Sequence, residues 1–168
     1  VRYKKATVTN PEDAEIWFKL GEAMINISYH GKAWILSKSM WSSAEMDYYW
    51  WGHDSQKALP NEADVPDYYA NMSAIICLEN ASRYCKDKNL GAKISYLGAM
   101  AERNKFWSQY YKNQPEDYEK QEKYHQDQML TFEKQYRNFF QLLSEKFNGD
   151  DYEKMIIKEC EGYKDFLH

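Results

Sequence analysis

A glycine within an apolar helical stripe near the N-terminus limits what this 168-residue chain can fold into. Trp17, Leu20, Gly21 and Met24 stand at positions i, i+3, i+4 and i+7, which share one face of an α-helix. Glycine costs a helix about 1 kcal/mol relative to alanine. A helix keeps such a glycine most readily where a second helix packs against the missing side chain. We therefore expect a helix over about 12–27 that packs closely on a neighbour.

The same residues resemble a tetratricopeptide repeat, a helix–turn–helix unit in which a small residue of the second helix follows the Trp, Leu and Gly of the first. Ala33 stands where the family places that small residue relative to Trp17. Later positions depart from the family, since Ser37, Met40 and Glu45 replace its usual aromatic, alanine and proline. The resemblance implies an all-α fold whose antiparallel helix pairs stack as a right-handed solenoid, because one unit alone cannot bury its apolar face.

The resemblance extends toward the N-terminus. Tyr3, Ala6 and Pro11 occupy positions typical of the end of a preceding repeat, and the chain begins with Val rather than Met. We therefore expect residues 1–168 to form a single helical-repeat domain from the C-terminal part of a longer array.

Apolar stripes predict further helices along the chain. We expect helices over about 31–50, from about 67 to the turn at 86–89, from there to 112, over 116–147 and from 150 or 151 to the end, with an irregular stretch over 51–66. Two of these helices carry weak versions of the first helix's spacing. They are marked by Tyr96, Ala99, Met100 and Arg103, and by Phe139 and Leu142.

Composition and charge exclude several classes of function. The net charge is −4, and no run concentrates positive charge, so the chain lacks the electrostatic signature of a nucleic-acid interface. No apolar run approaches the roughly 20 residues that span a bilayer, so we predict no transmembrane segment. The chain holds 15 Tyr, 7 Phe and 6 Trp, which suit packing between helices.

The cysteines do not indicate a disulfide framework. Cys77, Cys85 and Cys160 are odd in number, and the first two are separated by two helical turns on one expected helix. We expect them to be small buried side chains.

Motifs that carry chemistry are incomplete. Glu122 and His125 form one Glu-x-x-His, whereas a di-iron bundle needs two such motifs and two further glutamates. His53 and Asp54 lie in the expected irregular stretch without a nucleophile motif. We therefore predict no metal, no cofactor and no catalytic residue.

Four consecutive aromatic residues, Tyr48, Tyr49, Trp50 and Trp51, end the expected second helix. Successive helical residues point about 100° apart, so all four cannot face inward. Residues 52–66 could cover them, or they could form a platform for a peptide or a sugar ring, or an interface to another domain.

The chain is also similar to a group of uncharacterised helical-repeat proteins of Bacteroidota. The resemblance rests on the segment 24–34, Met-Ile-Asn-Ile-Ser-Tyr-His-Gly-Lys-Ala-Trp, and on the ending 156–160, Ile-Ile-Lys-Glu-Cys. It implies association with the cell envelope and no particular reaction.

Taken together, the sequence predicts a non-enzymatic scaffold that binds a protein or peptide. In tetratricopeptide repeats the first helix lines the concave face, and by this resemblance the groove positions are Glu15, Phe18, Lys19, Glu22 and Asn26. The alternative is a surface glycan-binding component that uses the aromatic platform. The third alternative is an enzyme, which the lack of a convergent set of catalytic residues disfavours.

Overall fold

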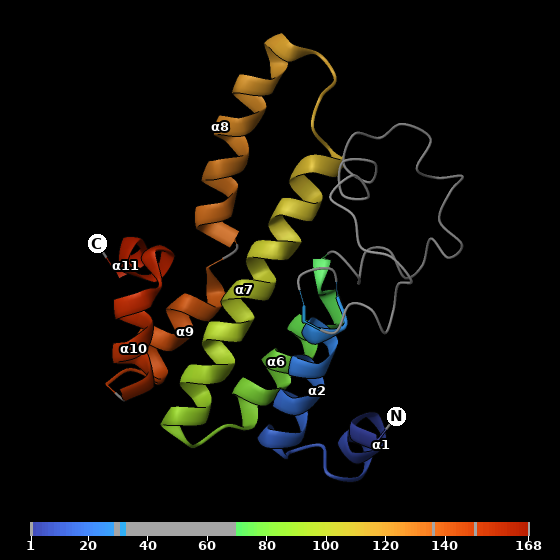
Figure 1. Ribbon diagram of the computed structural model, residues 1–168, viewed down its shortest axis with the longest axis vertical. Coiled ribbons are helices and arrows are strands. Elements are labelled where there is room, and N and C mark those ends of the chain that lie inside the picture. Colours follow the sequence, from blue (N-terminus) through green and yellow to red (C-terminus); the bar gives the residue numbers. More distant parts are fainter. Residues whose placement is uncertain (1, 29–30, 33–69, 136, 150, 168) are drawn as a thin grey trace.

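The computed structural model describes residues 2–28, 31–32, 70–135, 137–149 and 151–167 (Figure 1). These residues form helices and the turns between them, so the all-α prediction is confirmed for the described part of the chain. The predicted helix over 31–50 and the irregular stretch over 51–66 lie almost entirely outside it. The helices are α1 (Arg2–Thr9), α2 (Ala14–Asn26), α6 (Met72–Tyr84), α7 (Lys88–Lys112), α8 (Tyr118–Gln135), α9 (Asn138–Lys146), α10 (Asp151–Glu159) and α11 (Glu161–Leu167).

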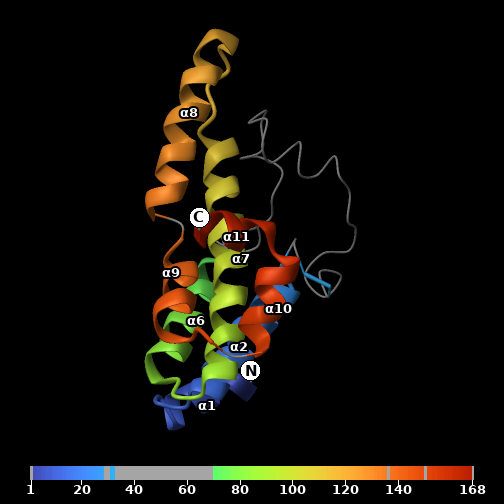
Figure 2. The same ribbon diagram turned by 90° about the vertical axis from the view of Figure 1, so that its left-hand side faces the viewer.

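From α2 to α8, successive helices in the described part of the chain alternate in direction. Figure 1 shows α2 and α7 running the same way, with α6 antiparallel between them, and α8 returning antiparallel to α7. Figure 2 shows that α9 continues the descent beside α7, and that α10 and α11 rise again on the other flank. Helix α7 is therefore central, because α6, α9 and α10 all pack against it.

Aspartates begin two of the helices. The Asp13 carboxylate accepts the Glu15 and Ile16 amides at 3.0 and 3.1 Å, which satisfies donors that the first turn of α2 leaves unpaired. Asp87 accepts the Leu90 amide at 2.7 Å at the start of α7. These caps explain why the predicted starts of both helices agree with the structure to within two residues.

Gly21 brings α2 against α6. A Cβ atom at this position would stand 2.9 Å from Leu78 Cγ and 3.4 Å from the Ala74 carbonyl oxygen. Leu78 and Ala74 are completely buried. The predicted close packing at Gly21 is therefore present, but its partner is α6, whereas Ala33 lies outside the described residues.

Two more glycines receive phenylalanine rings on the opposite side of the core. The ring of Phe139 covers Gly98 and the ring of Phe147 covers Gly91, each so closely that a Cβ atom would overlap the ring. The glycines are two turns apart on α7, as are the two phenylalanines along α9 and its C-cap, so the helices lie side by side over this length.

Helix α7 is buried on more than one face. Twelve of its 25 residues are buried, and they include neighbours in sequence such as Ile94-Ser95 and Ala101-Glu102. Neighbours point about 100° apart on a helix, so a single packing partner could not cover them. The small residues of α7 allow the approach of helices on both sides.

The structure corrects two predicted helices. The single helix expected over 116–147 is divided into α8 and α9, with Arg137 outside both, and the last helix is interrupted at Cys160, between α10 and α11. Neither break contains Pro or Gly, so local sequence gives no signal for it. Tertiary contacts described below account for both.

We predict that Gly98→Ala destabilises the fold by about 1–3 kcal/mol, because the added methyl group overlaps the buried Phe139 ring. Gly162→Ala is the matched control, since a Cβ there meets only Phe140 Cε2 at 3.9 Å. Urea denaturation of both variants measures the effect. Equal stability of the two variants would show that Phe139 does not lie over Gly98.

Gly21→Leu is predicted to destabilise the α2–α6 contact by a similar amount, about 1–3 kcal/mol, since Leu78 has no exposed direction in which to move. The melting temperature reports the change. A melting temperature equal to that of the wild type would mean that α2 and α6 do not meet at this glycine.

Candidate functional site

The predicted groove on α2 is only partly at the surface. Glu15 is exposed, Lys19, Glu22 and Asn26 are half-buried, and Phe18 is buried with 8% of its surface exposed. The placement of Phe18 in an open groove is therefore wrong. Its burial follows from the orientation of α2, whose most buried face carries Phe18, Gly21 and Ile25, whereas the prediction turned the helix by one position toward Trp17 and Leu20.

The four polar residues of the prediction do share one face of α2, at spacings of 4, 3 and 4 residues. Lys19 and Glu22 form an ion pair of 3.1 Å there. The Lys19 ammonium also lies 5.3 Å from the centroid of the Phe18 ring. This face is a polar surface on which the one positive charge is already paired with Glu22. The alternative platform, Tyr48 to Trp51, lies outside the described residues and stays a prediction.

A cavity of about 310 Å³ lies in the C-terminal half, beside the upper part of α7. Its apolar walls come from three helices and consist of Tyr96, Ala99, Met100 and Trp107 of α7, Phe132 of α8 and Phe140 of α9. The remaining lining residues are Arg103, Arg137 and Cys160, together with Gly162, which contributes no side chain. The volume is at the lower end of the range of about 300–1,000 Å³ that ligand pockets occupy.

The two arginines stand on different elements. Arg103 is exposed on α7, one turn before Trp107, and Arg137 is half-buried in the connection between α8 and α9. The Arg137 guanidinium carbon lies 5.7 Å from the centroid of the Phe132 ring, an arrangement that holds the cation against an aromatic wall. The pocket thus joins aromatic walls to two permanent positive charges.

Glu102 fixes the break that presents Arg137. One of its carboxylate oxygens accepts the Asn138 side-chain amide at 2.8 Å, and the other accepts the Phe139 backbone N–H at 3.2 Å. The carboxylate therefore caps α9 from a neighbouring helix, where Arg137 itself provides no side-chain cap. Burial raises the pKa of Glu102, and the hydrogen bonds from Asn138 and Phe139 oppose that shift.

A contact between Tyr163 and Glu153 stabilises the second interruption, the one between α10 and α11. The Tyr163 hydroxyl donates to the Glu153 carboxylate at 2.9 Å, and the Tyr163 ring lies 5.2 Å from that of Phe140. Tyr163 is completely buried, and burial together with the Glu153 carboxylate raises its pKa. Helix α11 is thereby turned over α9, which brings Cys160 and Gly162 to the pocket.

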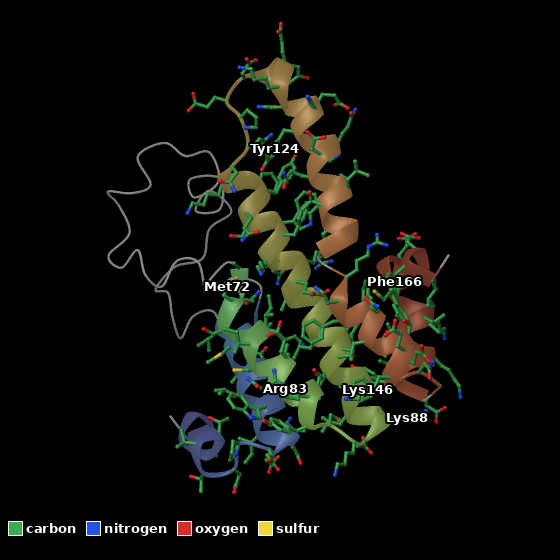
Figure 3. The ribbon with its side chains drawn as sticks, turned by 180° about the vertical axis from the view of Figure 1, so that it is seen from behind. Met72, Arg83, Lys88, Tyr124, Lys146 and Phe166 are labelled. Carbon is green, nitrogen blue, oxygen red and sulfur yellow. The ribbon has the colours of Figure 1, made fainter. Side chains whose placement is uncertain are left out.

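Aromatic side chains continue above the pocket, between α7 and α8. Tyr124 lies between α8 and the end of α7 (Figure 3). Its hydroxyl donates to the Tyr110 carbonyl oxygen at 2.8 Å, and the Tyr110 hydroxyl lies 3.2 Å from His125 Nδ1. The Trp107 ring meets two other rings edge to face, that of Phe106 at 5.1 Å and that of Tyr110 at 5.2 Å between centroids. His125, half of the Glu-x-x-His motif, thus contacts a tyrosine of α7. Within the described ranges no group of metal-ligating side chains occurs.

Part of the pocket was visible in the sequence. Tyr96, Ala99, Met100 and Arg103 were singled out there as a stripe at helical spacing, and they form one wall. Reasoning from sequence missed Arg137, Cys160 and Gly162 as site residues, because they reach the pocket through two breaks with no local signal. Among the cysteines, Cys77 and Cys85 are buried as predicted, whereas Cys160 is half-buried.

The comparisons with known proteins give no match. No protein-family model, no curated protein and no solved structure is significantly similar to this chain. Among the helices that the structure describes, none combines the length and the apolar character needed to cross a membrane.

We predict a pH dependence from Glu102. A pKa that is higher in the folded state than the ordinary value of 4.5 means that the folded protein binds this proton more tightly than the unfolded chain. The stabilisation is complete below pH 4.5 and declines as the pH rises through the raised value. The free energy of unfolding of the wild type relative to Glu102→Gln should therefore fall between pH 4 and pH 7, by urea titration. A relative stability that rises with pH would contradict burial as the dominant effect.

Proposed function

We propose that this chain is a non-enzymatic helical-repeat scaffold that binds a segment of another protein, and that the segment enters the pocket between α7, α8, α9 and α11. The observation that carries the proposal is the composition of that pocket, in which aromatic and aliphatic walls meet two arginines. Pockets of this kind bury an apolar group and orient it by a few polar contacts.

The frame around the pocket supports a binding role. Helices α6, α9 and α10 pack against α7, and glycine–phenylalanine contacts fix α9 against it. Sites built on packed helices hold their side chains in fixed positions, which lowers the entropy cost of binding. We propose further that these antiparallel helices belong to a tetratricopeptide-like right-handed solenoid, as the signature around Trp17 and Gly21 implies.

We prefer the pocket to the α2 face because a positive charge at the pocket lacks an ion pair, which an external partner could provide. On α2, Lys19 is neutralised by Glu22 within the same helix. At the pocket, Arg103 forms no ion pair with another described residue. The polar face of α2 stays the second candidate surface for the same function. Glycan binding through Tyr48 to Trp51 and association with the cell envelope stay predictions from the sequence.

We expect selection from a random peptide library to enrich related peptides on the immobilised wild-type protein. Fluorescence anisotropy then measures the affinity of these peptides for two variants. Gly162→Leu fills the pocket, whereas Gly162→Ala adds only a Cβ in ordinary contact with Phe140. The predicted result is binding to the wild type and Gly162→Ala and its loss in Gly162→Leu, with the peptides recovered intact by mass spectrometry.

Three outcomes would contradict the proposal. Failure to enrich any peptide would argue against a peptide-binding scaffold. Enriched peptides that bind Gly162→Leu normally but lose affinity for Lys19→Ala with Glu22→Ala would move the site to α2. Cleaved or modified peptides would show catalysis.

A further inference from the structure

The pocket between α7, α8, α9 and α11 carries an inference about ligand chemistry, which rests on the proposed function only in using the same pocket. We infer that it binds a carboxylate joined to an apolar body, with the carboxylate at Arg103 and Arg137 and the body against Trp107, Phe132 and Phe140.

The charge of the ligand follows from the arginines. Guanidinium groups stay protonated at any physiological pH and offer paired N–H donors that match a carboxylate. Arg103 has no ion pair with another described residue, and Arg137 is held against the Phe132 ring at the pocket wall. The carboxylate nearest in sequence, that of Glu102, directs its oxygens to Asn138 and Phe139 instead. An anion from outside therefore gives Arg103 the ion pair that the described residues do not supply, and both guanidinium groups repel a cation.

The apolar walls and the volume of the pocket indicate the size of the ligand's apolar part and the type of its acidic group. Six of the ten lining residues are aromatic or aliphatic, and the volume of about 310 Å³ admits one aromatic side chain with its acidic group. Removing a phosphate dianion from water costs more than removing a singly charged carboxylate, and an apolar wall returns little of that cost. The pocket therefore suits a small aromatic or branched aliphatic acid.

Gly162 and Cys160 give experimental access to the pocket. A Cβ at Gly162 meets only Phe140 Cε2 at 3.9 Å, so a larger side chain can occupy the space without displacing the frame. Cys160 is half-buried on the wall, whereas Cys77 and Cys85 are each 4% exposed. In the folded protein, Cys160 should therefore react with iodoacetamide before the other two thiols, and a bound ligand should shield it.

The test measures the rate of Cys160 alkylation by mass spectrometry and the affinity by calorimetry. The probes are 3-phenylpropionate, the neutral 3-phenylpropanol, the cationic 3-phenylpropylamine and phenyl phosphate. We expect 3-phenylpropionate alone to protect Cys160. Loss of one charged hydrogen-bonding partner should weaken it about tenfold in Arg103→Gln, and Gly162→Leu should abolish binding.

Arg83→Gln is the matched control. Arg83 is an exposed arginine of α6, and Figure 3 places it on the other side of α7 from Phe166 of α11. This variant should bind 3-phenylpropionate as the wild type does. Equal protection by 3-phenylpropanol, tighter binding of phenyl phosphate, or unchanged affinity in Arg103→Gln would each overturn the inference.

A second set of probes separates the two sources of the carboxylate. N-acetyl-phenylalanine presents it as a peptide C-terminus, and N-acetyl-phenylalanine amide lacks it. Protection by the acid and not by the amide supports a peptide end as ligand. If 3-phenylpropionate binds and neither N-acetyl-phenylalanine nor any library peptide does, the carboxylate inference holds and the protein-scaffold proposal fails.

Discussion

The structure depends on the contact between the glycine face of α7 and the phenylalanines of α9 and its C-cap. Phe139 and Phe147 are 3% and 2% exposed, and each ring occupies the place of a side chain that Gly98 or Gly91 lacks. Because interiors pack at crystal-like density, such an arrangement admits little sliding of one helix past the other. It fixes where α8 must end, where α9 begins, and therefore where Arg137 lies.

The interruptions between α8 and α9 and between α10 and α11 place residues of three further helices beside α7, where they line the pocket. At the first interruption Glu102 caps α9 in place of a local residue, and at the second Tyr163 and Glu153 turn α11 over α9. The pocket lies where both interruptions face α7. The buried carboxylate and the buried tyrosine thus have a positioning role, and the arginines and aromatic walls contact whatever enters.

The sequence predicted what depends on local periodicity and residue type. The helical class, the starts of α2 and α7, and the stripe from Tyr96 to Arg103 follow from helical spacing and turn residues, and the burial of Cys77 and Cys85 follows from their small apolar side chains. It failed where the cause is tertiary. Phe18 was assigned to a groove because the buried face of α2 was turned by one residue. The breaks at Arg137 and Cys160 have no Pro or Gly to mark them. Gly21 was correctly associated with a close approach, but periodicity alone does not say which helix approaches.

The most direct test of this account is an NMR measurement of the α7–α9 contact. We predict nuclear Overhauser effects between the Hα protons of Gly98 and the ring protons of Phe139, and between those of Gly91 and Phe147, together with upfield shifts of the glycine Hα signals caused by the rings. The Gly98 shift should disappear in Phe139→Leu while the shift at Gly91 remains. A folded spectrum without these effects would contradict the packing that fixes α9 and, with it, the pocket.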